Sequence, residues 1–164
     1  MVTEQERSIL SEDLIENIIK SPKFISKRID FEDIPHSEDN CHLTRTFKLN
    51  CERFDCRMMI RQNTKKPENF SVILIYKDSN RNEHAVLRLN GNHGTHRNRL
   101  EKTSVKGPHI HLMTERYQKR TTHPDGFAVE TDEYTDLESA IMVFMRMANI
   151  QYSDNRVEMI EECT

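Results

Sequence analysis

Four of the eight histidines in the sequence fall into two neighbouring pairs, His93 with His96 and His109 with His111. Residues two apart on a strand point to the same face, so His109 and His111 would stand side by side if their segment is extended. Neutral imidazole is a good ligand for zinc, and two imidazoles on one strand face can reach one ion without bending the backbone. We therefore expect a zinc site formed by His93, His96, His109 and His111.

The role of such a metal depends on its fourth ligand. Four protein ligands would make a closed site with a structural role, in which the ion ties a loop to the sheet. Three ligands and a water would support hydrolysis, with Glu115 as the base. Without a metal, His109 and His111 could instead be catalytic residues, acting as general acid and base on a phosphodiester. The spacing alone does not choose between these roles, and the histidines could also be surface or turn residues that bind nothing. We take the structural role as the first hypothesis, with no catalytic residue.

Positive charge is concentrated around the histidines. Between Arg88 and Arg120 the chain carries eight Lys or Arg residues against two acids, although the formal net charge of the whole chain is −3. Such a segment can bind anions, while the acidic remainder can bind basic surfaces. Both could equally be solvated faces that keep the protein soluble. The expected anion-binding residues are Arg97, Arg99, Lys102, Arg116 and Lys119.

Helical periodicity appears near each end of the chain. Residues 1–22 carry one apolar stripe and read as an N-terminal helix that begins at a Thr3–Glu6 capping box and ends at Pro22. A second helix is expected to begin at the capping box Thr135-Asp136-Leu137-Glu138 and to run to Ala148. Residues 23–150 would form a single α+β domain, and residues 151–164 an acidic tail.

Strand patterns fill the middle of the chain. Alternation is cleanest from Phe54 to Ile60, and the apolar run from Phe70 to Tyr76 is typical of a central strand. The expected strands cover residues 42–49, 54–60, 70–76, 84–89 and 109–117. We predict the α+β class, with an antiparallel sheet of about five strands packed by the C-terminal helix, and an N-terminal helix beside it.

Composition limits the cellular setting. No stretch approaches the ~18 unbroken apolar residues of a membrane helix, and the N-terminus lacks the features of a signal peptide. The four cysteines are too sparse for a disulfide scaffold, and we expect reduced thiols. These features favour a cytoplasmic protein without a membrane partner.

Three short motifs resemble a pattern found in small, mostly uncharacterised prokaryotic proteins of phages and mobile elements. The motifs are Leu87-Arg88-Leu89-Asn90-Gly91, then His96-Arg97-Asn98, then Gly107-Pro108-His109-Ile110-His111-Leu112. The resemblance covers about 30 residues and makes His96, Asn98, His109 and His111 the signature positions, with His93 as an addition. The Pro-Asp-Gly that commonly follows His-x-Asn in that pattern is missing here, so the conformation of this loop does not carry over.

The resemblance implies a partner more than a reaction. Some proteins of this size and charge distribution are phage inhibitors of CRISPR nucleases, which implies an anti-CRISPR inhibitor or regulator in the host cytoplasm. Its partner would be a host protein or a ribonucleoprotein such as a Cas nuclease, with nucleic acid as a further ligand. The alternative is a metal- or histidine-dependent nuclease or phosphodiesterase. A third hypothesis is a structural or toxin–antitoxin partner without metal.

Overall fold

A six-stranded antiparallel sheet organises the protein. The computed structural model describes residues 8–26, 28–29 and 41–153. The strand order is β2-β3-β4-β5-β8-β9, and every neighbouring pair is antiparallel. The strands are β2 (His42–Leu49), β3 (Asp55–Asn63), β4 (Phe70–Lys77), β5 (Glu83–Asn90), β8 (His109–Leu112) and β9 (Phe127–Glu130). The predicted α+β class is confirmed, and β9 is a strand that the sequence patterns did not indicate.

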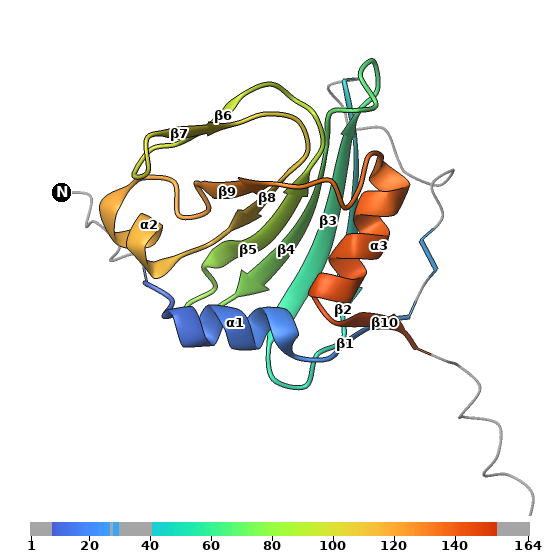
Figure 1. Ribbon diagram of the computed structural model, residues 1–164. Helices are drawn as coiled ribbons and strands as arrows, with labels where there is room; N and C mark the ends of the chain where they lie inside the picture. The colour runs from blue at the N-terminus through green and yellow to red at the C-terminus, as the bar shows by residue number, and fades with distance from the viewer. Residues whose placement is uncertain (1–7, 27, 30–40, 154–164) are drawn as a thin grey trace, which may run out of the picture.

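Two helices, α1 (Glu12–Lys20) and α3 (Leu137–Met147), close the core against the sheet (Figure 1). The alternating residues of β3 face them, with Met58 and Ile60 fully buried, and the neighbouring strands follow the same alternation. Ile18 of α1 and Phe144 of α3 fill the same apolar cluster. The expected helices near both ends of the chain are therefore present, and they pack into one shared core. The first begins only at Glu12, so residues 8–11 of the predicted helix are not helical.

Side-chain caps set the starts of these helices. Ser11 caps α1 by accepting a hydrogen bond from the backbone N–H of Leu14. The capping box expected at Thr3 and Glu6 lies outside the described residues. At α3 the capping box is formed by Asp136 and Ser139, one residue later than the predicted box from Thr135 to Glu138.

A short parallel pair joins the two ends of the described chain. The strand β1 (Lys23–Ile25) pairs with β10 (Ile150–Tyr152), so the regular structure continues beyond residue 150. Lys23 is fully buried here, and its ammonium donates hydrogen bonds to the carbonyl oxygens of Ile19, Ser21 and Ala148. These carbonyls lie at the C-terminal ends of α1 and α3, where helices leave acceptors unsatisfied.

The long connection between β5 and β8, residues 91–108, folds over the face of the sheet that the two helices leave uncovered. We call it the covering segment. It contains a small hairpin of β6 (His96–Asn98) and β7 (Thr103–Val105), which lies beside β9 in Figure 1. No helix among the described residues is long and apolar enough to cross a membrane.

The strand expected to continue from His109 to Tyr117 ends at Leu112, and this part of the prediction is wrong. Thr114 accepts a hydrogen bond from the backbone N–H of Tyr117 and caps a short helix, α2 (Glu115–Arg120). Because the chain turns into a helix there, Glu115 does not share a strand face with the two histidines of β8.

Candidate metal centre

The four predicted ligands meet between β8 and the covering segment. The ring centres of His109 and His111 are 4.9 Å apart, and those of His96 and His111 are 4.5 Å apart. The ring of His96 is 5.7 Å from that of His109, and the ring of His93 is 5.0 Å from it. The sequence therefore identified the cluster correctly as a spatial group.

Register explains why the strand pair of histidines points away from the core. Ile110 is paired with Leu89 of β5 and joins the apolar cluster below the helices. His109 and His111 consequently stand on the opposite face. They are nevertheless buried, with exposed fractions of 0% and 6%, because the covering segment folds over this face. Strand alternation alone does not indicate this burial, because it is the covering segment that excludes water from this face.

Three of the histidines have one ring nitrogen tied to a backbone carbonyl. His109 Nδ1 lies 2.7 Å from the oxygen of Gly107, and His111 Nδ1 lies 2.8 Å from that of Asp125. His96 Nε2 lies 2.7 Å from the oxygen of Gly126. A carbonyl can only accept, so each of these nitrogens carries the proton. The other nitrogen of each ring, Nε2 of His109 and His111 and Nδ1 of His96, is then the one that can act as a ligand, and that of His109 faces the side-chain amide of Asn90.

The environment keeps the two buried rings neutral. The pKa of His111 is lowered to about 3, mainly by burial and in smaller part by His109, His96 and Arg88, against the raising effect of its hydrogen bond to the Asp125 carbonyl. Burial is also the main cause that lowers the pKa of His109. A metal ion binding to these nitrogens at neutral pH would not have to displace a proton.

The spacing of the rings fits a tetrahedral ion. With Zn–N bonds of about 2.0–2.1 Å, imidazoles around one zinc place their ring centres roughly 5 Å apart. The distances among His96, His109 and His111, from 4.5 to 5.7 Å, bracket this value. Within the described residues, no three His, Cys, Asp or Glu side chains are already arranged as metal ligands. Metal binding would therefore require the three ligand nitrogens to move closer together.

The residues around the cluster include two that the sequence did not single out. The Tyr134 hydroxyl lies 2.8 Å from the carbonyl oxygen of Asn90 and 2.9 Å from that of His109, so it fixes the backbone beside the cluster. The side-chain amide of Asn90 lies 3.4 Å from Nε2 of His109. Asn90 directly follows the predicted strand 84–89 and belongs to the motif that ends at Gly91, but neither feature indicated its contact with His109.

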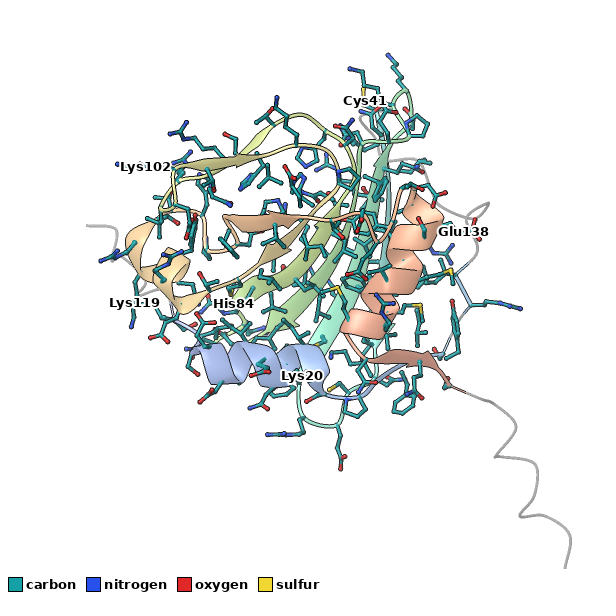
Figure 2. All side chains as sticks on the ribbon, viewed as in Figure 1. Lys20, Cys41, His84, Lys102, Lys119 and Glu138 are labelled. Atoms are coloured by element: carbon teal, nitrogen blue, oxygen red, sulfur yellow. The ribbon has the colours of Figure 1, made fainter. Side chains whose placement is uncertain are left out.

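The predicted base and most predicted anion ligands lie apart from the histidines. The carboxylate of Glu115 pairs with Lys119, and no contact between Glu115 and the four histidines occurs among the described residues. Arg116 pairs with Glu101. Figure 2 shows Lys102 on the outer edge of the molecule, at the β6–β7 turn.

Two predicted anion-binding residues do lie next to the cluster. Arg97 and Arg99 line a pocket of about 330 Å³ whose wall includes His96 and Tyr117. No acidic residue lines this pocket. The local charge thus agrees with the expectation of anion binding at these two positions.

Sheet, helices and histidine cluster together define the class: an α+β protein with a histidine-lined site beneath a covering loop. Residues 10–150 match the model of DUF6978, a family of unknown function, and the chain belongs to this family. The match includes all four histidines of the cluster. The chain matches no curated protein and no solved structure.

Proposed function

We propose that this protein binds a zinc ion through His96, His109 and His111. The observation that carries the proposal is the anchoring of all three rings by backbone carbonyls. Histidines that bind metals almost always donate their second ring N–H in this way, because the hydrogen bond fixes the tautomer and the ring orientation. Three imidazoles whose ring centres lie roughly 5 Å apart, each with its second ring nitrogen available as a ligand, form a set that suits zinc.

The proposed ion joins two parts of the chain. His96 belongs to the covering segment, whereas His109 and His111 belong to the sheet. Zinc would therefore hold the covering segment on the sheet, which is a structural role. His93 is exposed and sits next to His109. It can supply the fourth ligand and close the site, or leave that position to water or a bound anion.

Metal content is the direct test. Purified protein, exchanged with zinc and freed of loosely bound ions, should hold about one zinc ion per chain by elemental analysis. The variants His96→Ala and His111→Gln should lose it while their far-UV circular dichroism stays that of a folded protein. His123→Ala is the matched control, because His123 is an exposed histidine outside the ring cluster. Folded wild-type protein that takes up no zinc would rule the proposal out.

The inhibitory role implied by the resemblance stays a prediction. It requires complex formation with a host protein or a ribonucleoprotein such as a Cas nuclease, without chemical change to the partner. The nuclease or phosphodiesterase alternative is favoured by one observation, the acid-free pocket of Arg97 and Arg99 beside His96. Incubation of the zinc-loaded protein with labelled RNA or DNA separates the two, since only an enzyme would cleave it, and His111→Gln should then abolish cleavage.

A further inference from the structure

A second pocket opens over strands β3, β4 and β5, on the face of the sheet that carries the histidine cluster. It has a volume of about 210 Å³, and its lining includes Arg61, Ser71, Arg88, Asn90 and His93. None of its lining residues is acidic. Pockets for drug-sized ligands usually run from ~300 to 1,000 Å³, so this one suits a small anionic group better than a whole cofactor.

Strand register builds the floor of this pocket. Arg61 of β3 is paired with Ser71 of β4, Ser71 with Asn90 of β5, and Asn90 with His109 of β8. The four residues form one row across four strands, on the face that carries the histidine cluster. The Ser71 hydroxyl donates a 2.7 Å hydrogen bond to Oδ1 of Asn90. The side-chain amide of Asn90 in turn lies beside His109 Nε2, one of the proposed zinc ligands.

Arg88 adds a second positive charge to that of Arg61, beside this row of four residues. It is paired in register with His111, and its guanidinium makes a 2.6 Å ion pair with Asp125. Its Nε is buried and has no hydrogen-bond partner within the described part of the chain. Arg61, the other arginine of the pocket, has no ion pair among the described residues. Two guanidinium groups with unused donors are suited to the oxygens of a phosphate.

We propose that the pocket of Arg61, Ser71, Arg88 and Asn90 binds the phosphate group of a phosphate ester, next to the histidine cluster. Arg61 and the guanidinium of Arg88 donate to its oxygens, and the Asn90 amide supplies a neutral donor, while the Ser71 hydroxyl holds the Asn90 side chain in place. The ester's remainder extends past the exposed His93. Contact between this phosphate and a metal ion rests on the proposed zinc centre, whereas phosphate binding by the arginines does not.

The test measures binding of inorganic phosphate by calorimetry at constant ionic strength, in zinc-loaded protein and in protein kept metal-free with a chelator. Arg61→Gln should weaken binding about tenfold or more, the loss expected for a charge-assisted hydrogen bond. Arg57→Gln is the matched control. It removes the same charge from the same face of β3, but at a residue that pairs with Glu83 outside the pocket.

The outcomes separate this proposal from the zinc centre. Phosphate binding that Arg61→Gln weakens and Arg57→Gln leaves unchanged supports the pocket, even if the protein takes up no zinc. Zinc uptake without saturable phosphate binding would overturn the pocket alone. Equal losses in both variants would overturn it as well, since they would indicate unspecific attraction. Repeating the titration with a trinucleotide of RNA distinguishes the ligand's source, because a phosphodiester must bind through the same arginine if nucleic acid is the natural ligand.

Discussion

The side chain of Asn98 and the backbone of Ala128 exchange two hydrogen bonds. The amide nitrogen of Asn98 donates to the Ala128 carbonyl oxygen at 2.8 Å, and the Ala128 N–H donates to Oδ1 of Asn98 at 2.8 Å. The side chain of Asn98 therefore bonds to the edge of β9 as the backbone of a neighbouring strand would. It attaches the covering segment to the sheet two residues after His96. The Asn of the His-x-Asn motif has a structural task that supports the position of its histidine.

Replacing Asn98 with alanine should destabilise the protein by about 2–4 kcal/mol, because it leaves a buried N–H and a buried C=O without partners. Urea unfolding followed by circular dichroism measures the change. Asn92→Ala, an exposed asparagine in the same covering segment, should stay within about 0.5 kcal/mol of the wild type. A mild effect of Asn98→Ala would mean that water replaces both bonds.

The stability of the metal-free protein should fall on acidification. His111 is neutral in the folded protein down to a pKa of about 3, whereas in the unfolded chain it accepts a proton near pH 6.5. Its contribution is fully present above pH 6.5 and is lost as the pH falls from there towards 3, by up to about 1.4 kcal/mol per unit. Unfolding in urea at several pH values with a chelator present measures the slope. His111→Gln should flatten it, and an unchanged slope would place the effect elsewhere.

Tyr134→Phe removes only the hydroxyl that lies between the carbonyls of Asn90 and His109. The loss should cost about 1–3 kcal/mol, because two buried acceptors lose a shared donor. It should also weaken zinc binding about tenfold or more, in the way that changes in supporting residues affect metal sites. Competition with a chromogenic chelator measures the second effect. Tyr152→Phe, at an exposed tyrosine, is the control and should alter neither quantity.

Lys23→Met should be among the most destabilising single changes, by about 3–5 kcal/mol. It removes the buried ammonium that satisfies three carbonyls at the ends of α1 and α3. Burial lowers the pKa of Lys23, but the three acceptors favour its charged form. Lys20→Met, which affects an exposed lysine paired with Glu16, should cost less than about 1 kcal/mol. Both are measured by denaturant unfolding, and similar losses would contradict the assigned role of Lys23.

Periodicity was sufficient to predict most of the sheet. The bounds of β2 agree with the predicted strand. The strand β4 is one residue longer than predicted at one end, and β5 is one residue longer at both ends. These bounds were predictable because a long apolar pattern with strand periodicity is not compatible with a helix. The strand β9 was missed because only four residues form it, and just one of them, Ala128, is buried. The hairpin β6–β7 was missed for the same reason, since each strand has three mostly polar residues.

The histidine cluster could be predicted because its members are close in sequence, whereas its surroundings come from distant segments. Glu115 was misplaced because the cap at Thr114 competes with strand continuation. The acidic first turn and basic last turn of α2 were the available signal. Nothing in the local sequence indicates that Arg61 lies in the row of His109, since only the pairing of four strands brings them together.

The two faces of strand β8 lie in different environments. Ile110 packs in the apolar cluster, whereas the histidine on either side of it faces the covering segment. Insertion or deletion of a single residue within β8 would exchange these faces, because the side-chain period of a strand is two. Imidazoles would enter the apolar interior while an isoleucine took the place of the proposed ligands. The length of this four-residue strand is therefore more strictly constrained than the identity of most residues around it.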